Sequence, residues 1–131
     1  MQQDEFVVAV RESTGLPDNQ SAERAVRATL AVLGRRLSGG EAKDLAAQLP
    51  GTLGDELPAE APGEQFDVTT FYRHVAEHEG EGVTEAQARQ HARAIAKGLE
   101  TAISGGEWQH LSDQLPADYA DFLGTESVQK H

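Results

Sequence analysis

A thirteen-residue segment that occurs twice constrains the fold of this chain more than any other feature. The first copy, SGGEAKDLAAQLP, begins at Ser38, and the second, SGGEWQHLSDQLP, begins at Ser104, 66 residues later. In each copy Ser-x-x-Glu precedes apolar residues at helical spacing, which is the pattern of a capping box at the start of a helix. We therefore predict that Ser38 with Glu41, and Ser104 with Glu107, cap two helices, each of which ends before the closing proline.

The glycine pair in each copy, at residues 39–40 and 105–106, marks a helix boundary, because glycine is costly inside a helix. Two geometries fit the pattern. The pair can lie in the first turn of the new helix, or one glycine can close the preceding helix in a left-handed conformation. Both produce a tight corner between helices. Free backbone N–H groups at a helix start can also bind an anion, so the two Ser-Gly-Gly-Glu starts are candidate anion sites.

Apolar residues at spacings of three and four predict the same three-helix plan in both halves of the chain. In the first half we expect a helix over residues 3–13, a second helix capped by Asp18, and the helix of the first copy. In the second half Asp67 and Thr84 are the expected caps of the two matching helices. No stretch shows strand-like alternation of useful length. The predicted fold is all-α, with six main helices and some short turns.

The length of 131 residues fits one domain made of two repeats. We expect a single domain over residues 1–123, with repeat one at 4–57, a linker at 58–66 and repeat two at 67–123. One repeat alone would bury too little apolar surface to be stable. The two repeats are therefore expected to share one core and to face each other around a pseudo-twofold axis. Residues 124–131 are polar and predict a flexible tail.

Composition excludes several classes of function. The chain has no cysteine, so disulfides, thiol catalysis and thiolate metal sites are excluded. A formal net charge of −11, from 22 acidic and 11 basic side chains, argues against nucleic acid and anionic membranes as partners. The N-terminus resembles no signal peptide, and no apolar run approaches membrane-spanning length. We expect a soluble cytoplasmic protein.

The doubled Ser-Gly-Gly-Glu…Gln-Leu-Pro pattern is similar to that of a known family. Each copy follows a helix with the motif (D/T)xFxxxV, and a short acidic linker joins the two halves. In these features the chain resembles the bacterial family known as domain of unknown function 2267, from about Asp4 to Leu123. The resemblance implies an all-helical, soluble bacterial protein. It implies no substrate, cofactor or catalytic residue.

Histidine spacing suggests one metal site. His74-Val-Ala-Glu77-His78 matches the H-x-x-E-H pattern of inverted zinc peptidases, and two histidines four residues apart share a face of a helix. His91 is a candidate third ligand from the next helix. The chain is too short to build a peptidase cleft, and the first half carries no matching residues. We therefore expect His74 and His78 to be ordinary surface histidines and His91 to lie at the edge of the core, and we keep all three as alternative zinc ligands.

Aromatic residues suggest a surface for another protein. Trp108 stands where the first copy has Ala42, so the fold does not require a large ring at this position. With Tyr119 and Phe122 it is a candidate interface anchor. The alternative is that Trp108 packs on Ile103 at the start of its helix. These features predict a non-catalytic interaction or regulatory module, without a cofactor, that binds a protein partner or a second copy of itself. The alternative is a small metal- or anion-binding protein.

Overall fold

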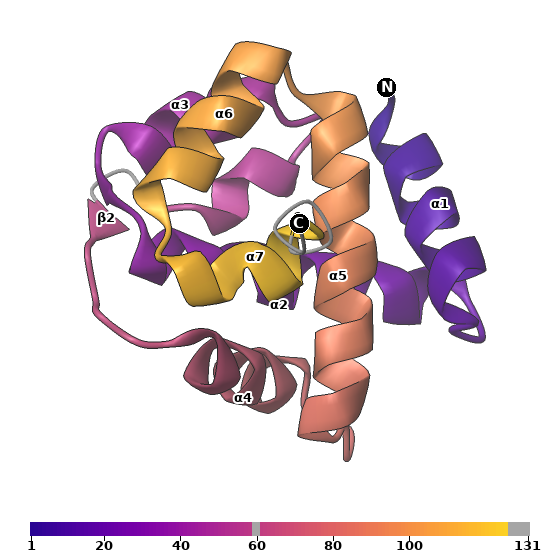
Figure 1. Ribbon diagram of the computed structural model, residues 1–131. Helices are drawn as coiled ribbons and strands as arrows, with labels where there is room; N and C mark the ends of the chain where they lie inside the picture. The colour runs from indigo at the N-terminus through magenta and orange to yellow at the C-terminus, as the bar shows by residue number, and fades with distance from the viewer. Residues whose placement is uncertain (59–60, 126–131) are drawn as a thin grey trace.

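The computed structural model describes residues 1–58 and 61–125, and this part of the chain is built almost entirely of helices (Figure 1). In chain order the elements are α1 (Gln3–Thr14), α2 (Asn19–Arg36), β1 (Ser38–Gly39), α3 (Glu41–Gln48), η1 (Leu53–Glu56), β2 (Ala61–Pro62), α4 (Val68–Glu79), α5 (Glu85–Ala102), α6 (Gly105–Gln114), η2 (Ala117–Tyr119) and α7 (Ala120–Leu123). The elements η1 and η2 are single 3-10 turns. The all-α prediction is confirmed.

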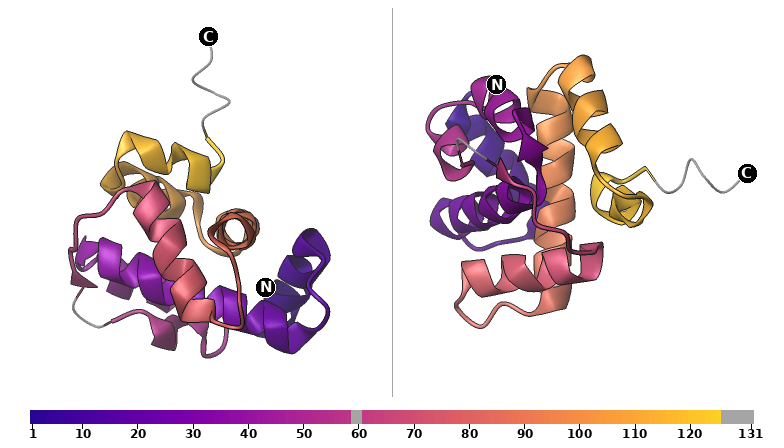
Figure 2. Two further views of the ribbon diagram at one scale, coloured as in Figure 1. Left: turned by 90° about the horizontal axis from the view of Figure 1, so that it is seen from below. Right: turned by 90° about the vertical axis from the view of Figure 1, so that its left-hand side faces the viewer.

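The two longest helices, α2 and α5, cross at the centre of the molecule (Figure 2). Both begin at the predicted caps: Asp18 accepts a hydrogen bond from the Ser21 N–H, and Thr84 forms a capping box with Gln87. Helices α1 and α4 pack against both of them. The second half therefore contributes one of the two central helices, and the halves share a core as expected.

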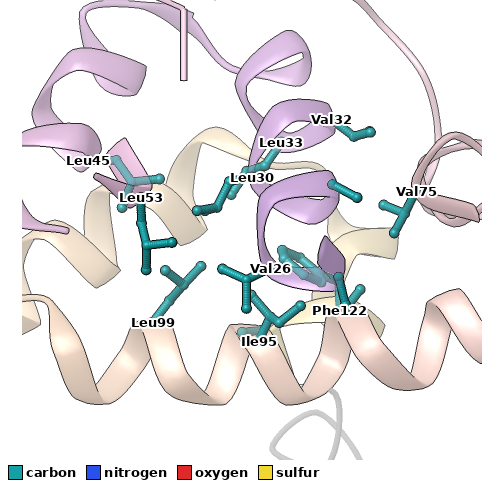
Figure 3. Packing of buried hydrophobic residues seen from close by; sticks show 14 of the residues in the cluster. Val26, Leu30, Val32, Leu33, Leu45, Leu53, Val75, Ile95, Leu99 and Phe122 are labelled. Carbon is teal, nitrogen blue, oxygen red and sulfur yellow. The ribbon is translucent and has the colours of Figure 1, made fainter. Parts of the chain in front are cut away.

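The core lies on the faces of α2 and α5 that turn toward each other (Figure 3). Val26, Leu30 and Leu33 of α2 are completely buried, as are Ile95 and Leu99 of α5. They lie three or four residues apart along each helix, so each set lies on one face of its helix. One continuous cluster of buried apolar residues joins both halves.

The part of the expected linker that follows residue 60 forms hydrogen bonds with the first half of the chain. β2 pairs antiparallel with β1, so that Ser38 faces Pro62. The Gly63 and Glu64 N–H groups donate to the carbonyl oxygens of Leu37 and Arg35. Residues 59–60, inside the predicted linker, and most of the predicted tail lie outside the described residues. The hydrogen bonds of residues 61–64 hold this part of the chain beside the end of α2.

Candidate functional site

The two Ser-Gly-Gly-Glu corners differ in their local geometry. At the second corner Ser104 is the N-cap, its Oγ accepts a hydrogen bond from the Glu107 N–H, and residues 105–106 form the first turn of α6. At the first corner α3 begins at Glu41, behind Gly40, with no side-chain cap. The prediction of a cap is confirmed for Ser104 and wrong for Ser38. The physical reason is that the Ser38 backbone is extended and paired with β2.

At the second corner the glycine pair lies in the first turn of the new helix, which is one of the two geometries that fit the sequence. Gly105 and Gly106 are helical, whereas Gly40 at the first corner has a φ of −87°. Neither corner uses Gly40, Gly105 or Gly106 as a left-handed closure of the preceding helix. The glycines instead keep the start of each helix free of side chains.

Reciprocal hydrogen bonds join the two corners. The Ser104 N–H donates to Gln48 Oε1 at 2.7 Å, and the Ser38 N–H donates to Gln114 Oε1 at 3.0 Å. Gln48 and Gln114 occupy the same position in the two copies of the repeated segment. Each copy therefore contributes a serine to one bond and a glutamine to the other. This exchange is what a twofold relation between the corners would produce.

The glutamates of the two copies meet between α3 and α6. Glu41 is 9% exposed and Glu107 is 6% exposed, so both carboxyl groups are buried. Together with Asp44 they offer carboxylate oxygens that all lie within 4.8 Å of one another. We call Glu41, Asp44 and Glu107 the acidic cluster. The capping-box role predicted for both glutamates is wrong, because their side chains turn into this cluster and the N–H groups of both serines bond to glutamines instead.

The acidic cluster is electrostatically unfavourable as it stands. Glu41 Oε2 and Glu107 Oε2 are buried without a hydrogen-bond partner outside the acidic cluster. Burial, a hydrogen bond to the Glu41 carboxyl group and the charges of Glu41 and Asp44 raise the pKa of Glu107 to about 8. A buried polar atom without a partner typically costs about 1–3 kcal/mol. Carboxyl groups at the Ser-Gly-Gly-Glu starts also disfavour the anion binding that the sequence suggested.

The histidines do not converge on one metal site. His74 Nδ1 lies 3.1 Å from Glu77 Oε1, and His78 is exposed at the end of α4. His91 is buried, with its Nδ1 3.0 Å from both carboxylate oxygens of Glu79. Over residues 1–58 and 61–125, the acidic cluster is the only group of three or more potential ligands close enough to share an ion.

The three candidate aromatic anchors do not form one surface. Tyr119 and Phe122 are completely buried and pack around Phe71, with ring centroids 5.6 Å and 4.8 Å from it. They belong to the core, because α7 packs against α5 and both rings contact Phe71 of α4 (Figure 1). Trp108 alone is partly exposed, and it borders a depression of about 310 Å³ formed with residues that include Leu115, Pro116 and Leu123.

Sequence reasoning missed both the acidic cluster and the buried His91–Glu79 pair. The signal for the cluster was present, since Glu41 and Glu107 recur at equal positions in the two copies. A glutamate at that position is explained equally well by capping, so the sequence pattern alone does not distinguish the two roles. The other predicted caps are correct: Asp67 Oδ1 accepts a hydrogen bond from the Thr70 N–H, as Thr84 does from Gln87.

Comparison with known proteins agrees with the resemblance in the sequence. No curated protein matches the chain. Over residues 1–58 and 61–125, no helix combines the length and apolar character needed to cross a lipid bilayer. The family model described as "Uncharacterized conserved protein (DUF2267)" matches residues 3–122, which is nearly the whole chain. The chain therefore belongs to the DUF2267 family of uncharacterized conserved proteins.

Proposed function

We propose that this chain is a non-catalytic helical module of the bacterial cytoplasm that binds a protein partner through the depression beside Trp108. The observation that carries the proposal is the partly exposed indole ring at the edge of this depression, which is lined by both apolar and polar residues, such as Leu115 and Gln109. Tryptophan is enriched among the residues that dominate binding energy at protein interfaces. An aromatic side chain on α6 therefore marks the surface that a partner would contact.

Comparison of the two copies supports a role for the indole beyond packing. Ala42 stands at the matching position of α3 and is completely buried. A methyl group is therefore sufficient for the α3 helix to pack, and the extra volume of Trp108 extends partly into solvent. Met1 is the only large apolar residue that is largely exposed in the described part of the chain. We therefore expect a small contact, in which one side chain of the partner enters the depression beside Trp108.

The polar groups and the overall charge support a binding role over catalysis. His74 and His91 are each engaged by a glutamate, and neither histidine belongs to the acidic cluster. The net charge of −11 disfavours nucleic acid and anionic membranes. A protein partner with a basic or neutral surface fits these features. A second copy of the chain would have to overcome the repulsion of two acidic molecules.

The test is a cross-linked pull-down followed by binding measurements with purified components. Each captured protein is purified and titrated against wild type, Trp108→Ala and the control Lys97→Ala, which alters the exposed face of α5. We expect one partner whose affinity falls by roughly 2 kcal/mol or more with Trp108→Ala and is unchanged with Lys97→Ala. Circular dichroism checks that both variants fold. Equal affinities for wild type and Trp108→Ala would contradict the proposed surface.

A further inference from the structure

We propose that the acidic cluster, Glu41, Asp44 and Glu107, binds a hard divalent cation such as Ca²⁺, Mn²⁺ or Mg²⁺ between α3 and α6. This site goes beyond the protein-binding function proposed above and does not depend on it. The inference begins with geometry. Glu41 and Asp44 lie three residues apart on one face of α3, and Glu107 faces them from α6.

The spacing of the oxygens matches a common ion. One carboxylate oxygen of each residue lies within 4.8 Å of the others. Oxygen ligands sit about 2.0–2.6 Å from Mg²⁺ or Ca²⁺, so ligands on opposite sides of one ion are about 4–5 Å apart. An all-carboxylate set without nitrogen or sulfur selects hard cations over zinc. Asp44 is exposed, which leaves a side open for water to complete the coordination.

A second observation indicates that the cluster lacks a partner. Glu41 Oε2 and Glu107 Oε2 are inaccessible to solvent and have no hydrogen-bond partner outside the cluster, in residues that are more than nine-tenths buried. No arginine, lysine or histidine of the described residues lies within 4.0 Å of the three carboxylates. Buried carboxylates are normally paired with a cation or hydrogen-bonded. A bound cation supplies the missing charge.

The surrounding bonds hold the ligands in place before an ion arrives. In each copy the glutamate lies between the serine and the glutamine that make the reciprocal bonds, so both ends of the α3–α6 pair are fixed. Leu45 and Leu111, which are completely buried, anchor the same two helices in the core. Ligands on such fixed elements lose little freedom when they bind. The repeated glutamates are thus positioned as two halves of one site.

Terbium luminescence tests the site directly, because Tb³⁺ substitutes for Ca²⁺ and is excited by a nearby indole. Trp108 is the single tryptophan of the chain and follows Glu107 directly. After removal of metals with a chelator, we expect indole-excited Tb³⁺ emission that saturates and that CaCl₂ or MnCl₂ displaces. The double variant Glu41→Gln, Glu107→Gln should weaken binding by about tenfold or more, because affinity follows the number of charged ligands.

Two further variants distinguish Tb³⁺ binding at the acidic cluster from weak binding to the other acidic side chains of the chain. Asp4→Asn with Glu100→Gln removes the same two charges from exposed positions and should bind Tb³⁺ as wild type does. Asp44→Asn removes one exposed ligand and serves as the test if the double variant does not fold. Absence of saturable emission from wild type would overturn the site. Equal affinities for wild type, Asp44→Asn and the double variant would also overturn it.

Discussion

At the scale of single residues, equivalent serines of the repeated segment make different interactions. Ser104 Oγ caps α6, whereas the Ser38 side chain caps no helix and the Ser38 backbone N–H donates to Gln114. Ser104→Ala should therefore lower the free energy of unfolding by about 1 kcal/mol through the lost cap. Ser38→Ala should change it by less than about 0.5 kcal/mol. Urea denaturation of both variants measures the difference, and equal losses would contradict the assigned start of α3.

The raised pKa of Glu107 predicts that the stability of the protein changes with pH in an unusual direction. Its pKa is raised from 4.5 to about 8 in the folded protein, so the folded state holds a proton that the unfolded chain has released. The free energy of unfolding should therefore fall as pH rises from about 4.5 to about 8, by at most about 1.4 kcal/mol per pH unit from this group.

The measurement compares Glu107→Gln with wild type in the presence of a chelator. The amide cannot ionise, so the variant should be more stable than wild type at about pH 8 and should lose this component of the pH dependence. Glu100→Gln, at an exposed position on α5, is the matched control and should follow wild type. A variant less stable than wild type at about pH 8 would show that Glu107 is not a buried, unfavourable charge.

At the scale of elements, the crossed glutamine bonds connect α3 and α6. Gln48→Ala and Gln114→Ala should each lower the free energy of unfolding by about 0.5–1.5 kcal/mol, the usual net value of one hydrogen bond. Hydrogen exchange should show faster opening at Ser104 in the first variant and at Ser38 in the second. Protection that is unchanged at both N–H groups would contradict the reciprocal arrangement.

Most of the helices could be predicted from the sequence because local signals determine them. Asp18, Asp67 and Thr84 cap their helices as expected, and the spacing of Val26, Leu30 and similar residues identified the buried faces. The cap predictions for Ser38 and for the two glutamates were wrong because segments far away in the sequence interact with these residues. Pairing with β2 removes Ser38 from its cap, and contact between the two copies redirects both glutamates. Such contacts are encoded in no single window of sequence.

At the scale of the whole molecule, the two copies of the repeated segment account for the site as well as the fold. α2 and α5 build the common core, and the corners that follow them bring α3 and α6 together (Figure 1). The pseudo-twofold axis of the complete repeats stays a prediction, supported at the corners by the reciprocal bonds. The repeated segment places one glutamate from each half of the chain in a shared buried position, where the proposed cation would bind.

The most direct test of this account is a crystal structure grown with MnCl₂ and measured at a wavelength where manganese scatters anomalously. The account predicts one strong anomalous peak between Glu41, Asp44 and Glu107, with metal–oxygen distances of about 2.0–2.6 Å. It also predicts that the Gln48–Ser104 and Gln114–Ser38 bonds are retained. Carboxyl groups that point apart, or a peak only at exposed surface acids, would contradict the claim that the two corners form one cation site.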